Sequence, residues 1–123
     1  MQPRILVIDD EEDICKLFQR ILRDEGYEIF TATNGKSGVA LFKAVERIKI
    51  VFLDIKMPKM DGIAALKRIK KVNKEIPVII ITGYGDLKTA KEAMKLGAID
   101  YISKPFKIDS VKSIVNDILK KEK

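Results

Sequence analysis

The sequence predicts an α/β fold in which five parallel strands form one doubly wound sheet with five helices, and two observations support this prediction. Short apolar runs alternate five times with segments whose apolar residues recur every three or four positions, which is typical of alternating strands and helices. The first apolar run, at residues 4–9, also lacks the polar alternation of a strand with one solvated face. With 123 residues, 46% of them hydrophobic, the chain is expected to form a single domain over residues 1–123.

The elements follow one another in a regular cycle. The first strand is predicted over residues 4–9, where a nearly continuous apolar run ends in two acids. A helix is predicted over residues 12–25, because apolar residues recur at helical spacing and Gly26 favours a stop. A second strand is predicted over residues 28–33, before the turn-forming pair Asn34-Gly35. The other helices are predicted over residues 37–47, 62–72, 87–96 and 108–121, and the other strands over 50–53, 78–81 and 99–102.

Residue counts exclude several kinds of chemistry. The chain has no histidine, and Cys15 is its one cysteine. An internal disulfide, a zinc site of Cys and His ligands, and nucleophile pairs that depend on histidine are therefore excluded. Any chemistry must use carboxylates, lysine, hydroxyls or a hard metal ion.

Charge and hydropathy limit the partners that we expect. The net charge of +6 comes mainly from lysines spread in ones and twos, with no arginine-rich or aromatic-interleaved patch, so direct nucleic-acid binding is not predicted. No apolar run approaches the roughly 18 to 20 residues that span a bilayer, so neither a membrane span nor a signal peptide is expected. Together with the single cysteine, this indicates a cytoplasmic protein.

Polar residues collect where the predicted strands end. Asp9 and Asp10 follow the first strand, Asp54 the third, Thr82 the fourth and Lys104 the fifth. Ligands of doubly wound sheets bind outside these carboxyl ends, and in the strand order 2-1-3-4-5 the first and third strands are neighbours. The three carboxylates then converge, and their repulsion requires a proton or a cation. Oxygen ligands select a hard ion such as Mg²⁺, for which Mn²⁺ is expected to substitute.

This set of residues predicts a phosphoryl-transfer site without a histidine base. Asp54 is the candidate nucleophile, Asp10 the direct metal ligand, and Asp9 a second carboxylate that acts partly through water. Lys104 supplies a point charge and Thr82 a hydroxyl donor for phosphoryl oxygens. On spacing alone, the alternative that these are ordinary acids in solvated loops stays open.

Four motifs in this order resemble the receiver domain of bacterial two-component response regulators, of the chemotaxis and sporulation-relay types. They are Val7-Ile8-Asp9-Asp10-Glu11, Leu53-Asp54-Ile55-Lys56-Met57-Pro58-Lys59-Met60-Asp61-Gly62, Ile81-Thr82-Gly83-Tyr84 and Gly97-Ala98-Ile99-Asp100-Tyr101-Ile102-Ser103-Lys104-Pro105-Phe106. The resemblance extends from about Arg4 to the last helix. It implies the flavodoxin-like receiver fold.

The resemblance implies a signalling switch rather than an enzyme with turnover, acting by self-phosphorylation and slow autodephosphorylation. Asp54 would accept a phosphoryl group from a phosphohistidine on a histidine kinase or phosphotransfer protein. Asp10, Asp54 and the backbone carbonyl of Lys56 would bind Mg²⁺, while Thr82 and Lys104 would contact the phosphoryl oxygens. The aromatic ring of Tyr101 would turn inward on phosphorylation and change the surface that a downstream protein reads.

The same resemblance yields three expectations about individual positions. The Lys104-Pro105 bond is expected to be cis, so that the chain turns Lys104 back toward the site. Lys56 and Tyr84 resemble the corresponding residues of the stand-alone sporulation relay receiver and, more loosely, of nitrogen-regulator-type receivers. They are expected to hinder the water that would hydrolyse the aspartyl phosphate. We therefore expect a long-lived phosphorylated state, a stand-alone receiver rather than one cut from a longer regulator, and a monomer or weak dimer.

The first helix is expected to offer a docking surface. Its apolar residues cover an arc of about 160° at roughly 100° per residue, which is wider than one sheet face needs. By resemblance to relay receivers, Ile14 and Leu17 are the expected exposed pair for the helices of a partner.

Two alternatives belong to other classes. A haloacid-dehalogenase-type phosphatase also uses an aspartate nucleophile and Mg²⁺, but it needs a second acid where this chain has Lys56. A flavin-mononucleotide binder of the flavodoxin type needs a phosphate-cradling loop after the first strand, where Glu11 and Glu12 would repel phosphate.

Overall fold

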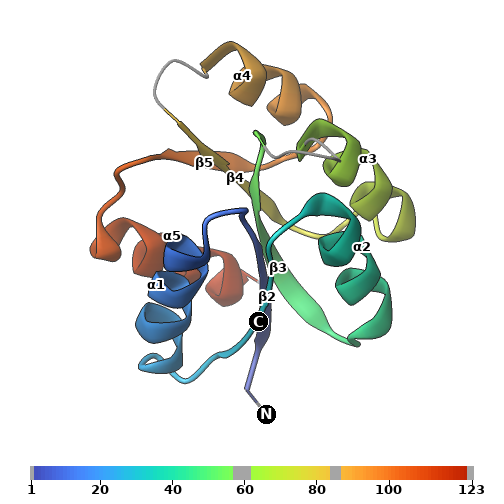
Figure 1. Cartoon of the computed structure of the whole chain (residues 1–123). Coiled ribbons are helices and arrows are strands. Elements are labelled where there is room, and N and C mark those ends of the chain that lie inside the picture. Colours follow the sequence, from blue (N-terminus) through green and yellow to red (C-terminus); the bar gives the residue numbers. More distant parts are fainter. Residues whose placement is uncertain (1, 57–61, 84–86, 122–123) are drawn as a thin grey trace.

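The computed structural model describes residues 2–56, 62–83 and 87–121, and it shows the predicted α/β architecture (Figure 1). Five parallel strands form one sheet in the order β2-β1-β3-β4-β5. The strands are β1 (Arg4–Ile8), β2 (Glu28–Ala32), β3 (Ile48–Asp54), β4 (Val78–Thr82) and β5 (Asp100–Ser103). The helices are α1 (Glu12–Arg23), α2 (Gly35–Ala44), α3 (Gly62–Val72), α4 (Leu87–Lys95) and α5 (Ile108–Lys121).

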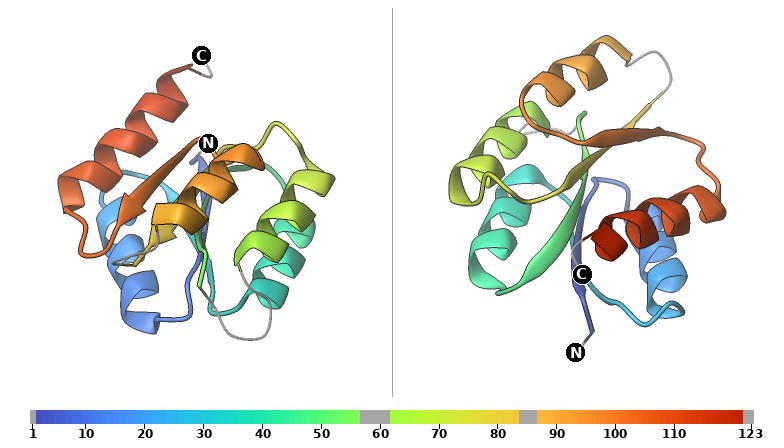
Figure 2. Two further views of the ribbon diagram at one scale, coloured as in Figure 1. Left: turned by 90° about the horizontal axis from the view of Figure 1, so that it is seen from above. Right: turned by 180° about the vertical axis from the view of Figure 1, so that it is seen from behind.

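Helices cover both faces of the sheet, with α1 and α5 on one side and α2, α3 and α4 on the other (Figures 1 and 2). Successive side chains of a strand point to opposite faces, so β1, β3 and β4 each supply residues to two cores. In β1, for example, Ile5 and Val7 pack under α1 and α5, whereas Leu6 and Ile8 pack under α2 and α3. This explains why β1 lacks polar alternation.

The core under α1 and α5 is built around aromatic rings. The ring of Phe18 lies 4.8 Å from that of Phe52 and 5.3 Å from that of Phe106, measured between ring centroids. The core under α2, α3 and α4 is mainly aliphatic, with Leu53 and Leu66 fully buried. Among the described residues, no helix combines the length and apolar character that crossing a membrane requires.

Several element ends differ from those predicted, most clearly at α2. The side chain of Asn34 accepts a hydrogen bond from the backbone N–H of Ser37 at 2.8 Å, so the helix begins at Gly35 rather than at Ser37. The helix stops at Ala44, because Val45 is extended and Arg47 has a φ of 62°. This tight connection lets β3 start at Ile48, earlier than the apolar run alone suggested.

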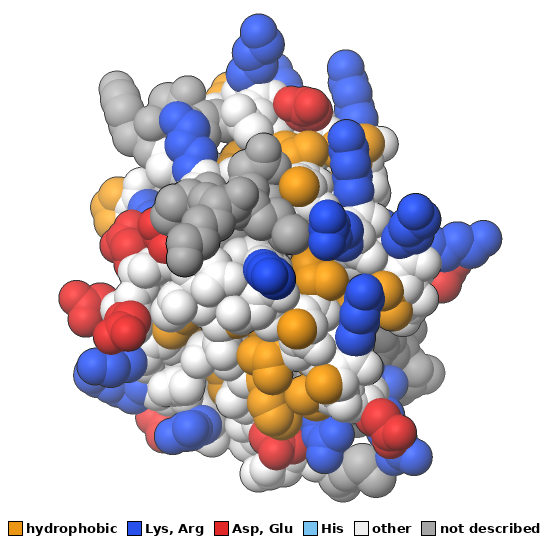
Figure 3. Space-filling model, turned by 45° about the vertical axis from the view of Figure 1, so that its right-hand side comes forward, with side chains coloured by type: hydrophobic (Ala, Val, Ile, Leu, Met, Phe, Trp, Pro, Cys, Tyr) orange, Lys and Arg blue, Asp and Glu red, His pale blue; other side chains and the backbone are white. Residues whose placement is uncertain are grey.

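The side of the molecule covered by α2, α3 and α4 is rich in basic side chains (Figure 3). Figure 3 shows Lys and Arg projecting from much of the face that it views, with apolar patches between them. The last turns of α3 and α4 contain lysine, and neither helix has an acidic residue in its first turn.

Candidate functional site

Strand register brings the predicted site residues together at one edge of the sheet. Ile8 of β1 pairs with Leu53 of β3, so Asp9 and Asp54 follow neighbouring positions. Asp54 in turn pairs with Ile81, which precedes Thr82. Thr82 pairs with Ser103, and Lys104 comes next along the chain. The parallel registers thus carry the residues of four strand ends to one place, as the strand order predicted.

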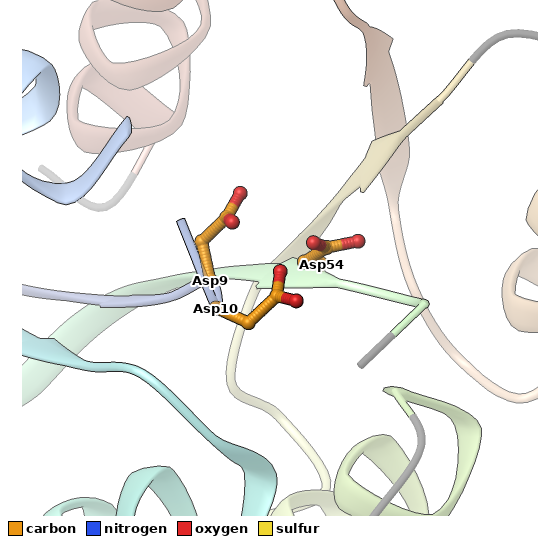
Figure 4. A group of neighbouring side chains, drawn as sticks. All are labelled: Asp9, Asp10 and Asp54. Carbon is orange, nitrogen blue, oxygen red and sulfur yellow. The ribbon is translucent and has the colours of Figure 1, made fainter. Parts of the chain in front are cut away.

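Asp9, Asp10 and Asp54 form a compact carboxylate cluster at the ends of β1 and β3 (Figure 4). One carboxylate oxygen of each lies within 4.8 Å of one from each of the others. Asp9 and Asp54 are buried, whereas Asp10 is exposed. The backbone N–H of Glu11 donates to Oδ1 of Asp9 at 2.9 Å, and that of Lys56 donates to Oδ1 of Asp54 at 3.0 Å. These bonds fix the two buried carboxyl groups.

Lys104 reaches into this cluster from the far end of β5. Its Nζ lies 3.1 Å from Oδ2 of Asp9 and 3.5 Å from Oδ2 of Asp54. It also lies 2.9 Å from Oε1 of Glu11, a contact that sequence reasoning missed. The adjacency of Glu11 to the two aspartates was the available signal, although a pairing between residues 93 positions apart needs the fold.

The electrostatics of the site disfavour full ionisation. Burial raises the pKa of Asp54 to about 7; the hydrogen bond from Lys56 opposes this shift, and the charge of Asp9 adds to it. Burial also raises the pKa of Asp9. For Lys104, burial lowers the pKa, but contacts with Glu11 and the aspartates outweigh it and raise the pKa above its ordinary value. One ammonium group therefore leaves excess negative charge among the carboxylates.

The donor set fits a hard divalent cation. The spread of 4.8 Å is close to the separation of about 4.2 Å between two oxygens on opposite sides of one Mg²⁺ at about 2.1 Å each. Oδ2 of Asp9 is buried and accepts no hydrogen bond from the described residues. The Lys104 ammonium, although at ion-pair distance from this oxygen, lacks hydrogen-bond alignment to it. A cation would satisfy this oxygen and the excess charge together.

The expected switch residues lie at the ends of β4 and β5. Thr82 is buried, and its hydroxyl donates to the Ser103 hydroxyl at 3.3 Å. Ser103 is a further residue that the sequence did not indicate. The side chain of Tyr101 is outward, with 37% of the residue exposed. The Lys104–Pro105 bond is cis, as expected.

The expected docking residues line a pocket beside Lys104. Ile14 and Leu17 are half-buried on α1, so they are neither fully covered nor fully exposed. The pocket has a volume of about 340 Å³. Its lining consists of Glu11, Ile14, Leu17, Lys104, Pro105 and Phe106. Of the two residues expected to set the phosphoryl lifetime, Lys56 lies beside Asp54, whereas Tyr84 lies outside the described residues.

Comparison with known proteins decides between the remaining alternatives. Residues 5–116 match the family described as the response regulator receiver domain. The chain belongs to this family. As a receiver, it is a signalling module of two-component pathways, whose members bind Mg²⁺ in an acidic pocket of the kind seen here. The comparisons do not support the phosphatase alternative.

Relatives of this receiver include both short proteins and parts of longer ones. It is 40% identical over 119 residues to sporulation initiation phosphotransferase F of Bacillus subtilis, covering 97% of this chain and 95% of that protein. It is 39% identical over 116 residues to the regulatory protein AtoC of Escherichia coli, covering 94% of this chain. The match spans 25% of AtoC.

Solved receiver structures share the fold. A receiver domain protein of Clostridium thermocellum matches with a TM-score of 0.91 at 37% identity, covering 98% of this chain and 96% of that one. The receiver domain of NtrX from Brucella abortus matches with a TM-score of 0.88 at 42% identity, covering 94% of this chain and 98% of that one. The five-stranded order 2-1-3-4-5 is thus that of the receiver fold.

Proposed function

We propose that this receiver accepts a phosphoryl group on Asp54 from a phosphohistidine of a histidine kinase or phosphotransfer protein, and passes the signal to a downstream protein. The observation that carries the proposal is the placement of Asp54: its buried carboxylate lies among two further aspartates, with Lys104 Nζ 3.5 Å from Oδ2. A carboxylate in such a site needs little beyond alignment and charge neutralisation to accept a phosphoryl group.

In the proposed reaction a carboxylate oxygen of Asp54 forms a bond to phosphorus as the bond between phosphorus and the histidine nitrogen breaks. The leaving nitrogen keeps the electron pair of that bond, and because the other ring nitrogen carries a proton, the side chain leaves as neutral imidazole. Asp54 must be ionised to attack, and Lys104 favours that state because its ammonium lowers the pKa of Asp54 against the effect of burial.

Asp9, Asp10, Asp54 and the backbone carbonyl of Lys56 are the proposed ligands of Mg²⁺, or of Mn²⁺ in its place. The ion would neutralise negative charge on the phosphoryl oxygens. Lys104 is proposed to hold one of these oxygens by its ammonium group. Thr82 is proposed to hold another, and its hydroxyl would then leave Ser103, to which it donates in this structure.

The signal is proposed to leave through the surface of α4, β5 and α5. Movement of Thr82 toward the phosphoryl group frees space at the end of β4, into which the exposed ring of Tyr101 on the neighbouring strand turns. The two arrangements form a two-state element that phosphorylation biases. Lys56 and Tyr84 remain predicted to lengthen the life of the phosphorylated state.

We further propose that residues 1–123 form one receiver domain that serves as a cytoplasmic relay, as a monomer or weak dimer and without direct nucleic-acid binding. The likeness to the Bacillus protein, a phosphotransferase of sporulation initiation, supports the relay role. Ile14 and Leu17, beside the pocket next to Lys104, are the proposed docking residues for the phosphodonor.

Phosphorylation from a small donor tests the proposed reaction directly. Incubation with acetyl phosphate and Mg²⁺ should add one phosphoryl group to the chain, located at Asp54 by mass spectrometry of peptides. Removal of Mg²⁺ with a chelator and the substitution Asp54→Asn should each abolish the label. Asp117→Asn, which alters an acid of α5 away from the site, should label normally. A label on Asp54→Asn at another residue would contradict the assignment.

A further inference from the structure

We propose that Glu11 is a positioning residue that holds Lys104 away from the phosphoryl site in the resting receiver and thereby slows acceptance by Asp54. This inference rests on the proposed function, because it concerns the rate of the same reaction. It assigns a role to a side chain outside the carboxylate cluster.

The contact distances show where Lys104 is held. Its Nζ lies 2.9 Å from Glu11, against 3.1 Å from Asp9 and 3.5 Å from Oδ2 of Asp54. The shortest ion pair of Lys104 is thus with the one carboxylate that belongs to neither the nucleophile nor the metal cluster. The ammonium group therefore lies nearer to Glu11 than to Asp54, the residue that would carry the phosphoryl group.

Glu11 stands at the start of α1, but its side chain forms an ion pair with Lys104 and does not cap the helix. Glu11 is the N-cap residue of α1, where a side chain commonly accepts a hydrogen bond from the first turn. Glu11 makes no such bond. Glu11 therefore does not stabilise the helix by capping it. The contact that its carboxylate makes is the ion pair with Lys104.

The burial of its partners determines which ion pair of Lys104 breaks when Asp54 is phosphorylated. The side chain of Glu11 is 59% exposed, so water can take over its carboxylate, whereas that of Asp9 is 0% exposed. Oxygens of an aspartyl phosphate on Asp54 would compete for the three hydrogens of the ammonium group. Lys104 can then release Glu11 without leaving a buried charge unpaired, and this release is the step that Glu11 slows.

Loss of the contact should therefore speed acceptance. We expect labelling by acetyl phosphate to be about two- to fivefold faster in Glu11→Gln, the range that a partly exposed ion pair supports. Glu11→Asp keeps the charge but shortens the side chain by one methylene group, which moves the carboxylate away from Lys104. It should show a gain similar to that of Glu11→Gln, because the contact is lost in both.

The experiment measures initial labelling rates for the natural chain, these two variants and Glu12→Gln, with acetyl phosphate and Mg²⁺. Glu12→Gln removes the same charge from the exposed first turn of α1 and should label at the natural rate. Salt screens exposed ion pairs, so the ratio of the Glu11→Gln rate to the natural rate should fall toward one as ionic strength rises. A purely structural effect of the substitution would not follow salt in this way.

The possible results separate this inference from the proposed function. If the natural chain takes no label at Asp54, the proposed function fails and the role of Glu11 fails with it. If the natural chain is labelled but Glu11→Gln is no faster, only the role of Glu11 is overturned. An equal gain in Glu12→Gln, or a gain in Glu11→Gln without one in Glu11→Asp, would overturn it too, because either would trace the effect to surface charge.

Discussion

Ionisation of Asp54 lowers the free energy of unfolding, because the carboxylate is buried. The group is 5% exposed, and burial raises its pKa from 3.8 to about 7. Because the folded chain binds this proton more tightly than the unfolded chain does, stability falls as pH rises between these two values. Above about pH 7, Asp54 is ionised in both the folded and the unfolded chain, and the loss of stability is complete. Mg²⁺ at the site would offset it by favouring the charged carboxylate.

We therefore expect Asp54→Asn to stabilise the receiver at pH 8 without divalent ions. The gain should be about 2–4 kcal/mol, since one pKa unit corresponds to about 1.4 kcal/mol. The gain should shrink toward zero as pH falls below 3.8, where Asp54 is protonated in both the folded and the unfolded chain. Urea unfolding at several pH values in the presence of a chelator measures this. Asp117→Asn provides the exposed control, and a gain in Asp54→Asn that does not vary with pH would contradict the explanation.

At the same scale, the residues that sequence reasoning found and missed differ in one respect. Asp9, Asp10, Asp54, Thr82 and Lys104 were found because each follows an apolar strand. Glu11 and Ser103 were missed because their roles depend on side-chain contacts with Lys104 and Thr82 across the fold. Strand ends follow from a pattern along the chain, whereas such pairings follow from rotamers that only packing determines.

At the scale of elements, the alternation and strand order were predictable and some ends were not. Continuous apolar runs and helical spacing are long signals, so each element was found. The ends of α2 depend instead on the hydrogen bond of Asn34 and on the backbone of Val45 and Arg47. The pattern of apolar and polar residues along the chain does not indicate such local geometry.

Helix α1 provides a test of docking. Leu17 is half-buried and lines the pocket beside Lys104, so Leu17→Ala removes part of the apolar surface offered to a partner. Transfer from a histidine phosphotransfer protein that labels the natural chain should slow by about tenfold, which corresponds to about 1.4 kcal/mol of lost binding. Labelling by acetyl phosphate should stay at the natural rate.

The exposed neighbour Lys16 supplies the matched control for that test. Lys16→Ala should leave both transfer reactions near their natural rates. If Leu17→Ala slows labelling from both donors equally, its effect comes from the folded site rather than from docking, and the assignment of this surface is wrong.

For the molecule as a whole, the sheet separates two cores that share no buried side chain among the residues that the structure describes. Ile21 of α1 belongs to one core and Ile69 of α3 to the other. Ile21→Val and Ile69→Val should each lower the free energy of unfolding by about 0.5–1.5 kcal/mol. In the double variant the two losses should add within about 0.5 kcal/mol, because the sites have no common partner. Urea unfolding of the four proteins measures the sum, and a larger deviation would show coupling through the sheet.

The separation of the cores also affects how such a protein can diverge. The proposed docking residues on α1 pack against one core, whereas α4 packs against the other. A substitution on α1 that changes which phosphodonor is recognised therefore does not alter the core residues that α4 packs against. Likewise, a substitution in the core beneath α4 does not alter the core residues that α1 packs against. Recognition of a phosphodonor through α1 and of a target through α4 can therefore change independently, whereas α5 shares the core of α1 and connects the two surfaces.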